Sequence, residues 1–261
     1  MTLRASYLHR FQLPKGQWVF VPDEATSKVA SEVIELVRAK WRPPDYYYHL
    51  RSGGHVAAAR KHLASRWFLV ADLKDFFGHA TRSRVTRFLN RQLRIDWEMA
   101  RGYAKQSVVM RPGSTPAQFV LPYGFPQSPI LASGCLQQSA LGTYLEQLER
   151  SPKTVVSVYM DDIILSSDDH ESLTDIKDEL LLKAKASHFP VNRRKLIGPG
   201  REAEVFNLRM SNCHLEVAAD RLHELLRTHD TTDSEDTKAG IRGYVAHVNR
   251  AQAEATFDRS T

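Results

Sequence analysis

The stretch VVSVYMDDIILSS at residues 155–167 places two adjacent carboxylates, Asp161 and Asp162, between two apolar runs. Residues 154–160 and 163–167 each have the composition of a buried strand, so the stretch predicts a β-hairpin with both aspartates at or beside its tip. Aspartate tolerates turn geometry, and an aspartate pair alone is more typical of a structural turn than of a reactive site. Its meaning therefore depends on the rest of the chain.

A second apolar strand also ends in an aspartate. The run RWFLVADL at residues 66–73 predicts a buried strand that ends near Asp72. Asp72 alone could cap the segment that follows it. If the two strands are neighbours, however, the carboxylates converge, and hard oxygen ligands without nearby thiols suit Mg²⁺ held by carboxylates and substrate phosphates. Two such ions assist phosphoryl transfer.

The composition is that of a globular intracellular protein. With 261 residues and 42% hydrophobic content, the chain can form one large domain or two small ones. Its two cysteines, Cys135 and Cys213, lie far apart, which indicates neither a disulfide framework nor a zinc site. Residues 1–18 contain no apolar signal core, and no window approaches the roughly 20 apolar residues of a membrane span. We therefore expect a cytoplasmic protein with no membrane partner.

The net charge of +6 comes from stretches of basic residues. Such stretches suit a phosphate backbone. They are equally typical of solvated helix faces. The residues concerned are Arg82, Arg84, Arg87, Arg91, Arg94, Arg193, Arg194 and Lys195.

Hydrophobic periodicity predicts helices interleaved with short strands. From residue 218 onward we expect only a helix, a polar linker at 230–238 and a last helical segment. The expected helices cover 27–41, 53–65, 81–93, 95–108, 130–150, 170–188, 218–229 and 239–255, and the remaining expected strands cover 191–198, 204–210 and 213–217.

Four segments together resemble the motifs of reverse transcriptases. YMDD at 159–162 resembles the YxDD signature, and FLVADLKDFF at 68–77 resembles the first palm motif. LPYGFPQSPILAS at 121–133 resembles the LPQGxPxSP motif, and VNRRKLIG at 191–198 resembles the lysine-bearing motif. The four occur in the family's order, and the resemblance covers about residues 45–215.

The resemblance is to prokaryotic members, namely the retron, abortive-infection and defence-associated (unknown-group) types. The passage at 53–77 is similar to their fingers-to-palm segment. Met160 stands where retrons usually carry alanine, and YGFPQSP at 123–129 looks more like the abortive-infection and defence-associated groups. We therefore expect that branch.

For the fold, the resemblance implies an α+β architecture, with the fingers and palm of a right-hand polymerase, an antiparallel palm sheet backed by helices, and a reduced thumb. The expected units are N-terminal helices and fingers at 1–66, a palm at 67–217 with a fingers-type insertion at about 80–120, and a reduced helical thumb or C-terminal extension at 218–261. A partner protein, a structured RNA or a second copy of the chain would compensate for the reduced thumb. The segment at 240–252 resembles a thumb fragment with a GYxxxV pattern, and it is equally compatible with a helix packed on the palm.

For the site, the resemblance makes Asp72, Asp161 and Asp162 the catalytic and metal-binding residues, with two Mg²⁺ ions as cofactor and Mn²⁺ as an alternative. Because successive strand side chains point to opposite faces, the two hairpin aspartates need not contribute equally, and we favour Asp161. The residues implied to bind the nucleotide are Asp75, Phe76, Phe77, Tyr123, Gly124, Gln127, Ser128 and Lys195.

Three of these positions carry a specific expectation. Phe77 falls where the family places an aromatic steric gate against a ribose 2′-hydroxyl, which favours deoxynucleotides; the alternative is a core aromatic. Lys195 corresponds to the lysine near the leaving pyrophosphate; the alternative is a solvated side chain. Tyr123 replaces the usual glutamine, so it either stacks on the nucleotide or packs.

The implied function is an RNA-directed DNA polymerase, a nucleotidyltransferase that copies an RNA template or structured non-coding RNA into DNA from dNTPs, in bacterial antiviral defence. One alternative is template-independent or protein-primed DNA synthesis, with Tyr46, Tyr47 and Tyr48 as exposed candidate primers. Another is a catalytically silent RNA-binding scaffold subunit. RNA synthesis is less favoured because YMDD and Phe77 both fit the reverse transcriptase pattern better.

Overall fold

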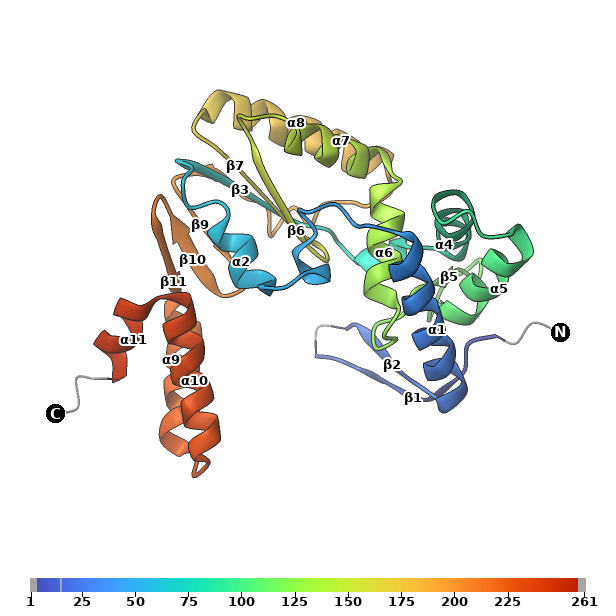
Figure 1. The fold of residues 1–261 in the computed structure, drawn as a ribbon, viewed down its shortest axis with the longest axis horizontal. Helices are drawn as coiled ribbons and strands as arrows, with labels where there is room; N and C mark the ends of the chain where they lie inside the picture. The colour runs from blue at the N-terminus through green and yellow to red at the C-terminus, as the bar shows by residue number, and fades with distance from the viewer. Residues whose placement is uncertain (1–3, 15, 258–261) are drawn as a thin grey trace.

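A four-stranded antiparallel sheet, in the order β6-β7-β3-β8, forms the centre of the computed structural model, which describes residues 4–14 and 16–257 (Figure 1). Its strands are β6 (Val155–Tyr159), β7 (Asp162–Ser167), β3 (Trp67–Asp72) and β8 (Ile197–Gly200). The expected α+β class, with antiparallel sheets backed by helices, is confirmed. No helix within the described residues is long and apolar enough to cross a membrane.

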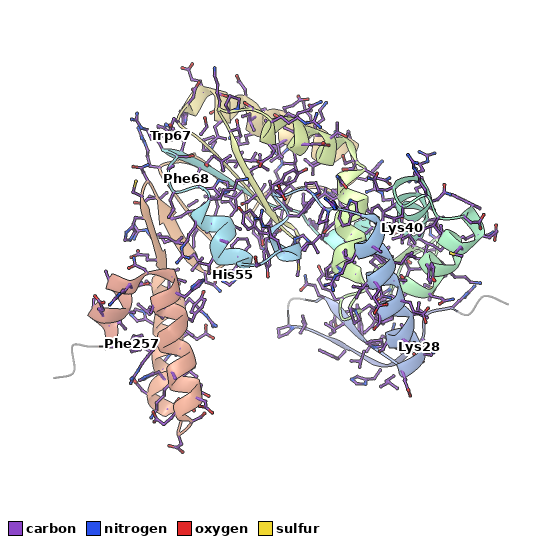
Figure 2. All side chains as sticks on the ribbon, viewed as in Figure 1. Lys28, Lys40, His55, Trp67, Phe68 and Phe257 are labelled. Atoms are coloured by element: carbon purple, nitrogen blue, oxygen red, sulfur yellow. The ribbon has the colours of Figure 1, made fainter. Side chains whose placement is uncertain are left out.

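Both faces of the sheet are buried, which explains the continuous apolar run in β3. Leu69 and Ala71 point into the larger core, whereas Phe68 and Val70 point into a second core on the opposite face. All four are at most 3% exposed. Figure 2 shows Phe68 at the end of the strand where β3 begins. The same alternation places Asp72 on the face of Phe68 and Val70.

Helices cover one face of the sheet. In Figure 1, α7 (Ala140–Glu149) and α8 (His170–Ala186) lie together along β6, β7 and β3. The expected single helix over 130–150 is wrong, because α6 (Ser128–Gln137) and α7 meet at an elbow. Ser139 caps α7 by accepting a hydrogen bond from Gly142 N, and a Cβ at Gly142 would overlap the backbone of α6.

An N-terminal hairpin that the sequence patterns did not predict lies beside the fingers helices. Its strands are β1 (Tyr7–Gln12) and β2 (Trp18–Pro22), and α1 (Glu24–Lys40) follows, capped by Asp23. The other elements of this part are η1 (Tyr48–Leu50), α2 (Gly54–Arg60), α3 (Phe76–His79), α4 (Arg82–Arg87), the π-helical turn η2 (Phe88–Gln92), α5 (Trp97–Ser107), β4 (Val109–Met110) and β5 (Phe119–Val120).

The C-terminal part is a meander followed by three helices. The meander consists of β9 (Glu202–Val205), β10 (Leu208–Ser211) and β11 (His214–Val217), and the helices are α9 (Ala219–Thr231), α10 (Glu235–Val248) and α11 (Arg250–Phe257). The expected linker at 230–238 is shorter than predicted, because α9 continues to Thr231 and Ser234 caps α10.

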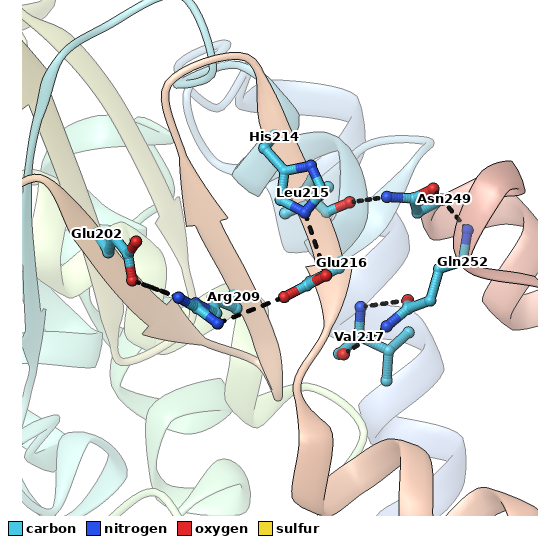
Figure 3. Close-up of polar contacts among 8 residues, drawn as sticks. All are labelled: Glu202, Arg209, His214, Leu215, Glu216, Val217, Asn249 and Gln252. Atoms are coloured by element: carbon cyan, nitrogen blue, oxygen red, sulfur yellow. Dashed lines mark hydrogen bonds and ion pairs between the residues drawn. The ribbon is translucent and has the colours of Figure 1, made fainter. Parts of the chain in front are cut away.

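Side-chain amides attach these helices to the meander (Figure 3). Val217 N donates to Gln252 Oε1 at 2.9 Å, and Gln252 Nε2 donates to Val217 O at 3.0 Å, so the amide pairs with the strand as a further backbone would. Asn249 Nδ2 donates to Leu215 O at 2.9 Å. From the other side, Arg60 Nη2 donates to the carbonyl oxygens of His247 and Val248 at the end of α10. The helices are therefore fixed to the palm.

A buried histidine joins two palm strands to the segment after α2. His62 is fully buried and lies 2.8 Å from Ser166 Oγ and 2.7 Å from Ser157 Oγ. Because Ser166 Oγ donates to Ser65 Oγ, His62 Nδ1 donates to Ser166. A neutral ring then accepts at Nε2 from Ser157, whose other acceptor, Ala58 O, is farther away at 3.4 Å. Burial lowers the pKa of His62 to about 3, so the ring stays neutral.

We predict that the difference in free energy of unfolding between the wild type and His62→Gln depends on pH, because His62 is neutral in the folded protein. A folded-state pKa below the ordinary 6.5 means that the stabilisation is fully present above pH 6.5 and declines as pH falls toward 3. The advantage of the wild type over the variant in free energy of unfolding should shrink by about 1.4 kcal/mol per pH unit in this window. Urea unfolding at pH 8, 6 and 5 measures it, and a difference independent of pH would contradict the assignment.

Candidate active site

The palm sheet brings the predicted carboxylates to one edge. Asp72, the last residue of β3, lies directly opposite Asp162, the first residue of β7. Opposed residues of an antiparallel pair project from the same face. Asp161 lies in the two-residue loop between β6 and β7, where its carbonyl oxygen accepts from Leu73 N at 2.8 Å. The expected hairpin, and the neighbouring position of the two strands, are thus confirmed.

The hairpin loop is held in an unusual backbone conformation. Met160 has a φ of 56°, in the left-handed region that few non-glycine residues adopt. Its N–H donates to His49 Nδ1 at 3.0 Å, and His49 Nε2 donates to Ser133 Oγ at 2.7 Å, which in turn donates to Pro129 O. Burial lowers the pKa of His49 to about 4, which keeps Nδ1 an acceptor. Residues of η1 and α6 therefore fix the loop.

The carboxylates destabilise one another's charged forms. Burial, followed by the charges of Asp161 and Asp72, raises the pKa of Asp162 to about 7. Burial also raises the pKa of Asp161. Lys195 Nζ lies 2.5 Å from Asp72 Oδ2, and this hydrogen bond raises the pKa of the lysine. The lysine side chain is 61% exposed and that of Asp72 is 8% exposed, so a solvated cation partly neutralises a buried carboxylate.

This donor set fits a hard divalent cation that shares its ligands with a substrate. Within residues 4–14 and 16–257, no three His, Cys, Asp or Glu side chains are arranged to hold a metal ion by themselves. Asp72 and Asp161 nevertheless line the same cavity, and Mg²⁺ commonly binds one or two carboxylates together with substrate phosphates. A cation there would also relieve the repulsion that raises the carboxyl pKa values.

The cavity beside these aspartates has a volume of about 570 Å³, within the range of small-molecule sites. Five segments far apart in the sequence form it: the N-terminal hairpin, the end of β3 with the segment after it, the segment around β4 and β5, the loop between β6 and β7, and the segment before β8. Its polar and aromatic lining includes Gln17, Trp18, Asp72, Lys74, Asp75, Arg111, Tyr123, Asp161, Asn192 and Lys195.

Tyr123 packs and also lines the cavity. Its ring meets the edge of Phe77 at a centroid distance of 4.7 Å, and its hydroxyl accepts from Gln17 Nε2 at 3.3 Å. Phe77 is 7% exposed and supports Tyr123 without lining the cavity itself. Phe76 is 1% exposed and packs against Phe189, which places it in the core.

Three residues predicted to contact the nucleotide, Gly124, Gln127 and Ser128, are not among the residues that line the cavity. Gly124 has a φ of 97°, and a Cβ there would overlap Phe20 O, so this glycine permits the loop to approach β2. Gln127 and Ser128 are at most 1% exposed, and their side-chain polar atoms have no hydrogen-bond partner within the described part of the chain. Their contact with a nucleotide stays a prediction.

The expectation that Tyr46, Tyr47 and Tyr48 are exposed is wrong. They are 2%, 1% and 9% exposed. Tyr46 and Tyr47 stack at 5.1 Å in the core, and Tyr46 O accepts from Val158 N. Burial raises the pKa of Tyr46 and Tyr47 above that of an ordinary phenol. The three tyrosines are therefore part of the core that packs against β6.

Two residues of the site carry no sequence signal that distinguishes them. The first is Arg111, whose Nη2 forms an ion pair of 2.5 Å with Asp75 Oδ2 at the cavity. Asp75 has a φ of 50°, and the absence of a side chain at Gly78 leaves room for the Asp75 carboxylate. The second is His49, which is one histidine among 11. Only the fold shows that either residue reaches the site.

We predict that His49→Ala loosens the hairpin loop more than it destabilises the fold. The change removes the acceptor for Met160 N and leaves a buried backbone donor unpaired, at a cost of about 1–3 kcal/mol. His49→Asn, which retains an acceptor, should recover part of this loss. Urea unfolding measures stability and amide hydrogen exchange at Met160 measures the loop; unchanged exchange in the alanine variant would exclude the proposed anchor.

Comparisons with known proteins agree with this geometry. A family model described as "Reverse transcriptase (RNA-dependent DNA polymerase)" matches residues 22–197. No curated protein matches the chain. Similar solved structures include a telomerase from Candida albicans in complex with a fragment of telomeric RNA, which has 9% identity, a TM-score of 0.50 and coverage of 91% of this chain and 47% of the telomerase.

Two further structures are similar at lower scores. One is a foamy viral protease-reverse transcriptase in complex with double-stranded DNA, with 16% identity, a TM-score of 0.48 and coverage of 92% of this chain and 35% of the viral chain. The other is an apo telomerase from Candida tropicalis, with 11% identity, a TM-score of 0.45 and coverage of 74% and 39%. This chain spans less than half the length of each of the three structures.

The family match extends over more than half of the chain and includes β3, β6, β7, the hairpin loop and most of the cavity lining. The likeness to the Candida albicans telomerase concerns the fold alone, and it agrees with the expected fingers and palm. The chain therefore belongs to the reverse transcriptase (RNA-dependent DNA polymerase) family.

Proposed function

We propose that this protein is an RNA-directed DNA polymerase that joins deoxynucleotides by a two-metal mechanism. The observation that carries the proposal is the placement of Asp72 and Asp161 in one cavity with the cationic side chains of Lys74, Arg111 and Lys195. Buried carboxylates suit metal ions, and cations beside them suit a triphosphate.

Asp72 and Asp161 would hold two Mg²⁺ ions, with Mn²⁺ as an alternative, and Asp162 would lower the local potential from the position opposite Asp72. When bound, such ions stabilise both the attacking and the leaving oxygen of an in-line displacement. The primer 3′-hydroxyl attacks the α-phosphate, the bond to the β-phosphate breaks, and pyrophosphate leaves. Lys195, already hydrogen-bonded to Asp72, provides a cation and a proton donor near the leaving group.

The remaining wall of the cavity would select the nucleotide. Tyr123, held by Phe77 and Gln17, provides a rigid aromatic surface against the sugar. Phe77 would thereby contribute to the steric gate indirectly, by holding the Tyr123 ring in place. A gate against the ribose 2′-hydroxyl favours deoxynucleotides. Arg111 and the backbone around Asp75, which line the same cavity, would contact the triphosphate.

The experiment that tests the function compares wild type with Asp161→Asn in deoxynucleotide incorporation on a primed RNA template with Mg²⁺. The variant removes one ligand charge with almost no change in shape, so we expect loss of incorporation without loss of stability. The product of the wild type should be complementary to the supplied RNA. Near wild-type incorporation by the variant would exclude the metal assignment, and no incorporation by wild type would leave the scaffold alternative.

We predict that Arg111→Ala raises the KM for dNTP about tenfold, because a charge-assisted contact to a phosphate contributes about 1.4 kcal/mol or more. Arg111 also pairs with Asp75, so the matched control is the double variant Arg111→Ala, Asp75→Ala. If the arginine binds the triphosphate, the double variant keeps the high KM. Recovery of the wild-type KM in the double variant would show that Arg111 only neutralises Asp75.

The biological setting is a proposal that rests on the motif resemblance. We place the protein among prokaryotic reverse transcriptases of the abortive-infection and defence-associated type, in the cytoplasm, with an RNA template or structured non-coding RNA. The division into 1–66, 67–217 and 218–261 is a working description, and one observation bears on it: Val245 and Val248 of α10 share a core with β9, β10 and β11. The proposed reduced thumb would thus work as part of the palm, helped by a partner protein or a second copy.

Protein-primed synthesis from Tyr46, Tyr47 or Tyr48 loses its support, because these side chains are buried in the palm. Template-independent synthesis uses the same cavity and differs only in its product. Sequencing the product of the incorporation experiment separates the two.

A further inference from the structure

Three arginines outside the proposed active site line a separate cleft. Arg84, Arg87 and Arg91 follow one another at helical spacing on α4 and η2, and they face the elbow between α6 and α7 and the end of α8. The cleft has a volume of about 380 Å³, and no carboxylate is among its lining residues. We call it the arginine cleft. In Figure 1, α4 lies beside α6, close to this elbow.

The fold holds the helical segment that carries the arginines, and Arg84 itself, in place. Val85, Phe88 and Leu89, on the opposite side of the same helical segment, are fully buried in the larger core. Arg84 Nη2 donates to Ser187 O at 2.5 Å, and its guanidinium lies 4.6 Å from the centre of the Phe189 ring. Solvated helix faces are not anchored in this way.

The cleft has more donors than acceptors. Arg84 Nη1 is buried without a hydrogen-bond partner in the described part of the chain, and no ion pair of Arg84, Arg87 or Arg91 occurs there. Burial, and also the charge of Arg87, lowers the pKa of Arg84. The first turn of α7 opens into the same cleft at Ser139 and Ala140, and a helix N-terminus favours negative charge. An anion with several acceptor oxygens suits this set of donors.

A neighbouring groove connects the arginine cleft to the proposed active site. This groove has a volume of about 560 Å³, shares Arg84 with the arginine cleft, and shares Gly78 and Arg111 with the nucleotide cavity. Its other lining residues include Arg82 and His188, and no carboxylate. Together the three hollows form one basic path over the surface. A single small anion would occupy one point of such a path, whereas a polyanion can follow it.

We propose that the arginine cleft binds the phosphates of a single strand of nucleic acid, which continues along the groove toward the active site. Arg84 binds one phosphate from a half-buried position that Ser187 and Phe189 hold, and Arg87 and Arg91 neutralise neighbouring phosphates. The inference rests on the proposed function for the kind of polymer, and it adds a binding surface that the cavity does not contain.

The test uses the full chain carrying Asp161→Asn, so that binding is measured without synthesis. Fluorescence anisotropy with a labelled single-stranded RNA of about 20 nucleotides gives the affinity at several salt concentrations. The test variant is Arg87→Gln, Arg91→Gln, since both residues are exposed and neither carries the packing role of Arg84. The matched control is Arg38→Gln, Arg42→Gln, which makes the same charge change at exposed positions on and after α1.

We expect the test variant to bind RNA about tenfold more weakly, with the slope of log affinity against log salt reduced by about 1.4, and the control to bind as the parent does. The charge-retaining variant Arg87→Lys, Arg91→Lys should keep most of the slope. Equal affinities of test and control variants would overturn the proposal. The proposal would also be overturned if inorganic phosphate raised the melting temperature of the parent through these arginines while the Arg87→Gln, Arg91→Gln variant bound RNA as tightly as the parent.

Activity is read separately, in the chain with Asp161 intact. Extension of a short primed template, too short to reach the cleft, should proceed at the wild-type rate in the Arg87→Gln, Arg91→Gln variant. Failure of the wild type to extend any primer would sink the proposed function and leave the RNA-binding result standing. Wild-type extension together with equal RNA affinity of the two variants would sink the arginine cleft alone.

Discussion

The cross-strand pair Asp72 and Asp162 is the constraint on which the rest of the structure depends. A strand that is buried on both faces ends in a carboxylate, and its partner strand begins with another. Each carboxylate loses hydration and meets a like charge, and the raised pKa of Asp162, about 7, reflects both effects. The sheet tolerates this because apolar packing on both faces, over Phe68 to Ala71, holds the strands in register. Positive charge beside Asp72 and Asp162 therefore stabilises this end of the sheet.

A solvent-exposed cation supplies this positive charge, and neutral groups support the loop. Lys195 reaches Asp72 from the solvent side and is not part of the core. By contrast, His49 and His62, which hold the loop and the strands behind it, are buried, and burial lowers the pKa of each. Neutral donors and acceptors fix geometry without adding a charge that would compete with the site. Neutral histidines thus fix the position of the loop, and Lys195 supplies the positive charge beside it.

The sequence was informative wherever a motif coincided with a secondary-structure element. The apolar strands, their terminal aspartates and the hairpin could be predicted, because periodicity and the position of Asp72, Asp161 and Asp162 are local properties. Tyr46 and Tyr47 were misjudged, because three consecutive tyrosines have no periodicity that indicates which core they enter. The break at Ser139 was missed because the apolar pattern continues through it, and only close packing at Gly142 requires the elbow.

The contribution of the N-terminal hairpin was the least predictable part of the site. Residues 7–22 contain few local signals, yet Gln17 and Trp18 line the cavity. What fixes them is contact with a distant loop: Phe20 N donates to Tyr123 O at 2.9 Å, and Gly124 admits the strand. Such long-range backbone pairing cannot be read from one segment.

The C-terminal helices are physically connected to the proposed catalytic loop. The connection runs through His55, at the end of α2 nearest those helices in Figure 2. Its ring lies 6.2 Å from that of Tyr244 on α10 and 6.1 Å from that of Tyr159, which directly precedes the loop. Phe206 contacts both His55 and Tyr159, at 5.7 and 5.2 Å. Close packing of these rings ties the position of Tyr159 to that of α10. The C-terminal helices are thereby part of the packing that supports the residue before Asp161 and Asp162.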